Sequence, residues 1–199
     1  MNNNKKNQLR KKLRASRNSL TKMEQRVASV ALAKRVTRTR TYCASKRIAL
    51  YFASDGEIST DELMARIWRS GRQCYMPILS CAIGERLWFA PVDLNSKFQI
   101  NRFGIPEPAV ASRKLVDARR LDLILMPMVG FDLQGNRLGM GGGFYDRTLA
   151  FQHHRQKWVR PRLIGLAHEC QRVDKLEISS WDVPLHAVAT DKNYYQFKK

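Results

Sequence analysis

Short apolar blocks alternate along this chain with mixed polar segments. A short, nearly continuous apolar run bounded by turn residues is typical of a buried strand. The clearest is LDLILMPMVGFD at residues 121–132, whose consecutive apolar positions suit a strand covered on both faces. Further strands are predicted at residues 47–53, 73–79, 85–92, 162–169 and 186–191.

Two helices are predicted before the first strand. Residues 5–17 look helical and are strongly basic. A second helix is expected to begin after Thr21, because Thr21 and Glu24 have the spacing of a capping box. One face of this helix is expected to pack on the core, and it carries Met23, Val27, Val30 and Ala31.

A further helix is expected from about Thr60 to the stop signal Gly71. Ser59 and Glu62 have capping-box spacing at its start. Its predicted core positions are Leu63 and Ile67. The segment FGIPEP at residues 103–108 is expected to be loop, because two prolines exclude a helix.

Strands that alternate with helices predict an α/β fold, with a mainly parallel sheet covered on both faces. A length of 199 residues is most simply one domain, residues 1–199, with a basic helical segment at about 5–38. Ligands of such sheets bind beyond the carboxyl ends of the strands. The loops expected at that edge are residues 54–59, 130–146 and 167–171.

Basic residues are concentrated near the N-terminus. The formal net charge is +19, and residues 1–47 hold fifteen Lys or Arg against the single acid Glu24. Such a segment can attract nucleic acid, an anionic membrane surface or a polyanionic small molecule, and charge alone does not choose among them. A basic nucleic-acid-binding protein is therefore an alternative, although the sequence has no RNP motif, zinc finger or KH-type unit.

The sequence shows no sign of a targeting or membrane segment. MNNNKKNQLRKK at its start lacks an apolar h-region, and no stretch approaches the roughly 18 apolar residues of a membrane span. The cysteines have no zinc-site spacing, which suits reduced thiols in a cytoplasmic protein. They are Cys43, Cys74, Cys81 and Cys170.

Residues 135–150, GNRLGMGGGFYDRTLA, carry the most specific chemistry. Their glycines can expose consecutive N–H groups, and the helix expected from about Phe144 adds its positive end, so the loop suits phosphate. Arg137 and Arg147 can supply charged donors. The loop is not a Walker loop, because no Lys-Ser or Lys-Thr follows the glycines, and the GxGxxG dinucleotide fingerprint fails at Phe144.

A mobile glycine hinge without a ligand is the alternative interpretation of this loop. Asp146 argues against it. A carboxylate beside bound phosphate is repelled unless a cation such as Mg²⁺ lies between the two groups. A nicotinamide-dependent oxidoreductase is a further alternative, but it rests only on the α/β pattern and the glycines.

Read in full, MPMVGFDLQGNRLGMGGGFYDR at residues 126–147 resembles the signature of the 5-formyltetrahydrofolate cyclo-ligase family, also called 5,10-methenyltetrahydrofolate synthetases. The resemblance continues through KNQLR, SDGEIST, FGIPEP and WDVPL, in the family's order. It implies a three-layer α/β/α, Rossmann-like fold of the NagB/RpiA/CoA-transferase-like kind. It also implies MgATP-dependent conversion of 5-formyltetrahydrofolate to 5,10-methenyltetrahydrofolate, with release of ADP and phosphate.

Family members are thought to transfer the γ-phosphoryl group to the formyl oxygen, after which N10 closes the ring. The resemblance assigns catalysis to Arg137, Tyr145 and Arg147, and Mg²⁺ binding to Asp146 and Asp182. It assigns ATP binding to Lys6, Arg10, Arg137, Leu138, Gly139, Met140, Gly141, Gly142, Gly143, Phe144 and Tyr145. The substrate-binding set is Phe52, Glu57, Phe103, Gly142, Gly143 and Phe144.

The chain departs from the family pattern inside the glycine loop. Other members often carry basic residues where this chain has Met140 and Gly142. Transition-state charge must then be met by other basic residues, namely Lys6, Arg10, Arg137 or Arg147. His186 stands where some members have a further Asp. The expected partners are 5-formyltetrahydrofolate and ATP, with no membrane and no required nucleic acid, and we expect a monomer.

Overall fold

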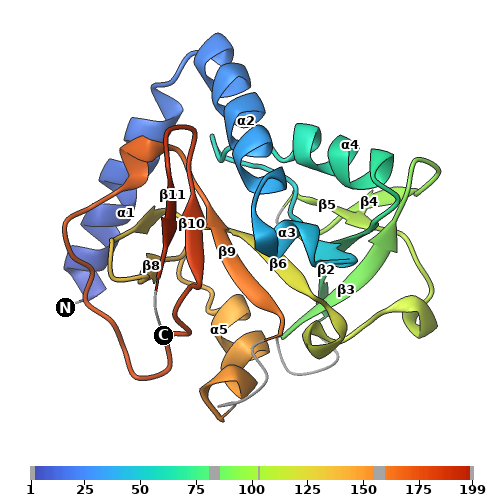
Figure 1. Ribbon diagram of the computed structural model, residues 1–199. Helices are drawn as coiled ribbons and strands as arrows, with labels where there is room; N and C mark the ends of the chain where they lie inside the picture. The colour runs from blue at the N-terminus through green and yellow to red at the C-terminus, as the bar shows by residue number, and fades with distance from the viewer. Residues whose placement is uncertain (1–2, 81–85, 103, 155–159, 198–199) are drawn as a thin grey trace.

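A mostly parallel sheet forms the centre of the molecule (Figure 1). The computed structural model describes residues 3–80, 86–102, 104–154 and 160–197. Within them, the sheet has seven strands in the order β11-β10-β9-β6-β1-β2-β3, and β3 and β11 are its antiparallel edges. The strands are β1 (Arg47–Ala49), β2 (Gln73–Ser80), β3 (Arg86–Val92), β6 (Leu123–Pro127), β9 (Arg162–Leu166), β10 (Ala187–Ala189) and β11 (Tyr194–Gln196). The predicted α/β fold is confirmed.

The central strand β6 explains why the sequence reads as continuously apolar there. It pairs with β1 on one side and β9 on the other, and its side chains alternate between two buried clusters. The strand is shorter than predicted because it ends at Pro127, which has no N–H to donate. Beyond it, β7 (Gly130–Phe131) forms a separate hairpin with β8 (Arg137–Leu138).

Helices cover both faces of the sheet and give three layers (Figure 1). On one face, α2 (Lys22–Thr37) and α4 (Asp61–Arg69) contribute Leu32 and Ile67 to the same cluster as Ile48 of β1. On the other face, α5 (Phe144–Leu149) contributes Leu149 to a second cluster. The other described helical elements are α3 (Arg40–Cys43) and the 3-10 turns Ser112–Lys114, Ala118–Arg120, Ala150–His154 and Glu169–Gln171.

The start of α2 was predicted correctly, but its buried face was not. Thr21 accepts a hydrogen bond from the Glu24 amide (3.2 Å), and Glu24 accepts one from the Thr21 amide (2.7 Å). The predicted core residues Met23, Val27 and Val30 are 68%, 60% and 45% exposed. Apolar residues lie along two faces of the helix. The face whose apolar residues continue to Val36 is the one that is buried. This buried stripe consists of Ala28, Leu32, Ala33 and Val36.

The capping box predicted for α4 is wrong, although its core positions and its stop are confirmed. Thr60 is the N-cap, and its hydroxyl donates to the Tyr51 carbonyl (2.6 Å). Glu62 instead accepts a hydrogen bond from Arg66 (2.8 Å). Because the Thr60 hydroxyl is bound to the segment that follows β1, local spacing does not decide the cap. Leu63 and Ile67 are buried, and Gly71 follows with a φ of +66°.

The predicted loop at residues 103–108 is wrong in part. β5 (Pro106–Pro108) pairs with β4 (Phe98–Ile100) as a small antiparallel ladder. Prolines are tolerated in such an edge strand because it needs few ladder donors. The ladder lies beside β2 and helps to wall the site described below. Phe103 lies outside the described residues.

The N-terminal helix α1 (Asn3–Asn18) matches the prediction for residues 5–17 and packs beside the β7–β8 hairpin. Leu13 shares a buried cluster with Val129 and Leu138. Figure 1 shows α1 running along one side of the sheet, next to β8. This packing brings basic residues of α1 to the glycine loop. No helix in the described part of the chain is long and apolar enough to cross a membrane.

Candidate active site

A cavity of about 1270 Å³ lies at the carboxyl ends of β1, β2 and β6. Two of the three predicted loops, residues 54–59 and 130–146, contribute to its wall. The third, residues 167–171, does not line it in the described structure; residues 176–182 do so instead. The cavity brings together these predicted site residues: Lys6, Arg10, Phe52, Glu57, Arg137, Leu138, Gly139, Met140, Gly141, Gly142, Gly143, Phe144, Tyr145, Asp146 and Asp182.

Arg10 lies on the glycine loop. Its Nε donates to the Gly139 carbonyl (2.8 Å), and its Nη1 donates to Asn7 of the same helix (2.7 Å). Gly141 has a φ of +106°, and a side chain there would begin 3.7 Å from the Arg10 guanidinium carbon. Any residue with a side chain would be strained at this position because of the positive φ. Lys6, one helical turn earlier, lines the same cavity.

A second guanidinium is attached to the loop from its other end. Arg147 donates to the Gly142 carbonyl (2.7 Å) and lies 5.0 Å from the centre of the Phe144 ring. Gly143 begins α5 with a φ of +63°. Arg147 is not part of the described cavity wall. Residues 139–143 of the loop include no basic residue, but Arg10 and Arg147 donate hydrogen bonds to two of its carbonyl groups.

Asp146 and Asp182 both line the cavity, and Asp146 binds the amide of the residue that follows Asp182. Asp146 accepts hydrogen bonds at Oδ1 from the buried Arg137 and from the Val183 amide (3.2 Å). Asp182, next to Val183, accepts one at Oδ2 from the Ser179 amide (2.7 Å). Among the described residues, these bonds leave one oxygen of each carboxylate without a donor.

This arrangement fits Mg²⁺ better than a metal held by protein alone. Mg²⁺ in nucleotide sites is usually bound through one or two carboxylates, with phosphate oxygens and water as its other ligands. No group of three or more His, Cys, Asp or Glu side chains suitable for a metal occurs in the described part of the chain. A cation at Asp146 and Asp182 would therefore need oxygens from a bound phosphate.

The opposite wall combines apolar side chains with the acid Glu57. Phe52 meets Phe98 edge to face, with ring centres 5.2 Å apart. Glu57 accepts a hydrogen bond from the Ser54 amide (3.2 Å), and burial raises the pKa of its carboxyl. Burial also raises the pKa of Tyr145, and the nearby charge of Glu57 adds to that shift. Tyr145 therefore keeps its phenolic proton and can donate a hydrogen bond into the cavity.

Glu107 is a cavity residue that the sequence reading missed. It is buried, and its Oε1 accepts hydrogen bonds from the Leu79 amide (2.8 Å) and from Asn101 (2.9 Å). Glu107 belongs to FGIPEP, a motif that was recognised, but an acid between two prolines has no periodicity to indicate burial. The ladder formed by β4 and β5 supplies that burial.

Asp55 joins the loop after β1 to α1. It accepts hydrogen bonds from Arg14 (2.6 Å), Arg17 (3.0 Å) and Asn18 (3.1 Å). These donors, Arg14 first, lower the pKa of Asp55 to about 2. Its φ of +49° places it in the left-handed region, which the neighbouring contacts must hold.

The lowered pKa of Asp55 predicts a pH-dependent contribution to stability. A carboxyl whose folded-state pKa is depressed stabilises the protein above its unfolded pKa and loses that contribution as pH falls. We expect Asp55→Asn to lower the free energy of unfolding at neutral pH. The difference from wild type should shrink as pH falls from about 4 toward 2. Urea unfolding across this range measures it, and a difference that stays constant would contradict the prediction.

Comparisons with known proteins agree on one family. A model of the "5-formyltetrahydrofolate cyclo-ligase family" matches residues 2–191. A 5-formyltetrahydrofolate cyclo-ligase of Haemophilus influenzae is 39% identical over 187 residues, covering 93% of this chain and 97% of the relative. One of Escherichia coli is 36% identical over 186 residues, covering 93% and 100%. The solved 5,10-methenyltetrahydrofolate synthetase of Aquifex aeolicus superimposes with a TM-score of 0.79 at 29% identity, covering 98% of this chain and 93% of that one.

Proposed function

This chain belongs to the 5-formyltetrahydrofolate cyclo-ligase family of ligases, and we propose that it converts 5-formyltetrahydrofolate to 5,10-methenyltetrahydrofolate with consumption of MgATP. The observation that carries the proposal is one cavity with two chemically different walls. A glycine loop holding Arg10 forms one wall, and an apolar surface with the acid Glu57 forms the other. At about 1270 Å³, the cavity exceeds the usual range for a single drug-sized ligand, roughly 300–1,000 Å³.

On the nucleotide side, the residues of this chain would bind and orient phosphate. Arg10 and Lys6 supply positive charge from α1, and the glycines let the phosphates approach the backbone closely. Asp146 and Asp182 would hold Mg²⁺, which when bound neutralises charge that develops on the transferred group. Arg137 keeps the Asp146 carboxylate turned toward the cavity through their ion pair.

On the folate side, Glu57 would accept hydrogen bonds from pterin N–H groups, while Phe52 packs against the ring. The formyl oxygen of the substrate would take the γ-phosphoryl group and release ADP. N10 would then attack the formyl carbon and release its proton to solvent, and phosphate would leave as the new C–N bond closes the ring. Tyr145, which keeps its proton, would donate a hydrogen bond to an oxygen at the point where nucleotide and folate meet.

The main contribution of the protein would be positioning. Phosphoryl transfer needs little covalent chemistry from the enzyme, so bringing the formyl oxygen in line with the γ-phosphate supplies much of the rate. We further propose that residues 1–199 act as one domain. The expected monomeric state and cytoplasmic location remain predictions, as does the role of Phe103.

The activity can be tested by mixing the purified protein with 5-formyltetrahydrofolate, ATP and Mg²⁺. We expect near-ultraviolet absorbance of the conjugated methenyl product to rise, with one ADP formed per product. Omission of ATP or Mg²⁺ should stop the reaction, and NAD should not replace ATP. Salt-dependent binding of RNA without any folate turnover would instead favour a nucleic-acid-binding protein.

A further inference from the structure

Arg17 is the largest fully buried side chain among the described residues, with an exposed fraction of 0%. An arginine is almost never buried to this degree unless it is paired, because removing its charge from water is costly. Arg17 lies on α1 about two helical turns beyond Arg10, so one helix carries it and the nucleotide-side residues. Hydrogen-bond acceptors around Arg17 must therefore compensate the charge of its buried guanidinium.

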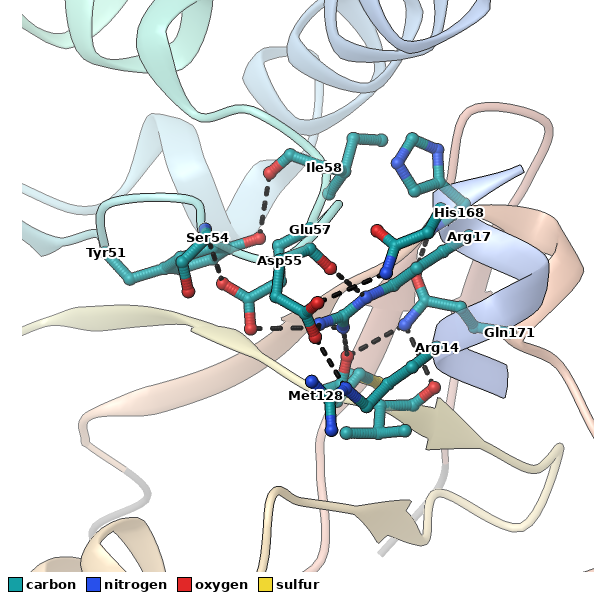
Figure 2. Close-up of polar contacts among 12 residues, drawn as sticks. Arg14, Arg17, Tyr51, Ser54, Asp55, Glu57, Ile58, Met128, His168 and Gln171 are labelled. Atoms are coloured by element: carbon teal, nitrogen blue, oxygen red, sulfur yellow. Dashed lines mark hydrogen bonds and ion pairs between the residues drawn. The ribbon is translucent and has the colours of Figure 1, made fainter. Parts of the chain in front are cut away.

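Its guanidinium joins two loops at the carboxyl end of the sheet (Figure 2). Nε donates to the Asp55 carbonyl (2.8 Å), and Nη2 donates to Asp55 Oδ2 (3.0 Å). Nη1 donates to the Met128 carbonyl (3.3 Å), directly after β6, and lies 3.9 Å from Glu57 Oε1. Gln171 donates to the same Met128 carbonyl (2.8 Å). The arginine thus ties the loop after β1 to the end of β6.

The loop that Arg17 holds needs an external support. Asp55 and Gly56 have φ values of +49° and +74°, so two successive residues are in the left-handed region. For Asp55 this backbone is unfavourable and persists only where neighbours fix it. Two of the three donor atoms of Arg17 bind Asp55, and the next residue but one is Glu57. The position of the Glu57 carboxylate thus depends on this backbone.

The charge of Glu57 depends on the same contact. The ionisable groups that face it are Arg17 from α1, Asp55 from its own loop, Tyr51 after β1 and Tyr145 from α5. Arg17 is the cation in this set. It lowers the pKa of Glu57, whereas burial, the larger effect, raises it. Loss of the cation would leave the carboxyl protonated over a wider pH range.

We propose that Arg17 is a positioning residue for the folate side of the site: it fixes the 54–57 loop and keeps the Glu57 carboxylate oriented and charged for the substrate. This inference rests on the proposed function, because it requires Glu57 to bind the pterin. Arg17 acts through Glu57 and is not itself on the cavity wall. Its loss should therefore affect 5-formyltetrahydrofolate much more than ATP.

Arg14 provides a matched control on the same helix. It donates to the same atom, Asp55 Oδ2 (2.6 Å), but 44% of its side chain is exposed. Among the described residues, its hydrogen bond and ion pair are with Asp55, and it has neither with Glu57 or Met128. Arg14→Met removes one partner of Asp55 and leaves the buried support in place. Arg17→Lys keeps the charge but cannot reproduce the three-donor geometry.

The test measures kcat and KM separately for each substrate, across pH, in Arg17→Lys, Arg17→Met and Arg14→Met. Misplacement of a contact by about 1 Å can cost roughly 10²-fold. We expect Arg17→Lys to raise KM for 5-formyltetrahydrofolate about 10- to 100-fold and KM for ATP less than about twofold. In Arg17→Met, the acid limb of kcat/KM for the folate should move to higher pH, with partial rescue in Arg17→Lys. Arg14→Met should change each of these values far less than the Arg17 variants do, because the two bonds from Arg17 to Asp55 remain.

The outcomes distinguish a failure of this inference from a failure of the proposed function. If wild type turns over the folate but Arg17→Lys matches Arg14→Met, or loses both substrates equally, the positioning role is wrong. If wild type shows no ATP-dependent turnover, the proposed function fails and this inference fails with it. If Arg17→Met does not fold, a cycle of Arg17→Lys and Glu57→Gln decides. Additive losses in that cycle would overturn the proposal, because a residue that acts through Glu57 has little further effect once Glu57 is changed.

Discussion

Arg10→Ala is expected to lower kcat/KM for ATP by about 10²–10³-fold, the usual cost of removing one donor that stabilises transition-state charge. Residues 139–145 of the glycine loop carry no Lys or Arg, and Met140 and Gly142 stand at its centre. Arg10 lies on that loop through the Gly139 carbonyl and beside Gly141. Its guanidinium can therefore provide the charge that the loop itself lacks.

The variant should remain folded, because Arg10 is not buried and its described contacts are with one carbonyl and Asn7. Lys11→Ala is the matched control: this residue is adjacent, basic and exposed, and it is not part of the described cavity wall. Steady-state kinetics with both substrates, together with calorimetric binding of ATP, measure the effect. Equal losses in the two variants would show that the general charge of α1, and not Arg10, attracts the nucleotide.

The sequence was sufficient to find this wall because its signals are local. A glycine run that follows a buried strand places a flexible loop at the carboxyl edge of a parallel sheet, where ligands bind. Gly141 and Gly143 do adopt positive φ values. The arginines were predictable as nearby charges, whereas their attachment to loop carbonyls was not, since it depends on how α1 docks against the β7–β8 hairpin.

Features that depend on distant packing could not be predicted in the same way. Arg17 stands in a strongly basic helix, where a solvated charge is the ordinary interpretation, and its burial comes from contacts with the segments after β1 and β6. The same limitation applies to α2, whose exposed Met23 and Val27 have helical spacing as good as that of the buried stripe. Periodicity gives the faces of a helix, but tertiary contacts choose which face is buried.

Asp146→Asn is expected to reduce turnover by more than about 10²-fold, since loss of even an outer partner of a metal ligand costs 10–100-fold in affinity or activity. Asn retains an oxygen that can accept from Arg137 and from the Val183 amide, so the variant can keep both hydrogen bonds but loses the negative charge of the ion pair. It lacks the second anionic oxygen that a Mg²⁺–phosphate complex would use.

The metal role can be separated from the structural one by titrating Mg²⁺ in the activity assay and in ATP binding, alongside thermal unfolding. A metal ligand predicts that Asp146→Asn needs far more Mg²⁺ at temperatures where the variant is still folded. Asp182→Asn is expected to change the Mg²⁺ requirement in the same direction, because its carboxylate lies on the same wall. An unchanged Mg²⁺ requirement with a lower unfolding temperature would instead make Asp146 the partner that compensates the buried charge of Arg137.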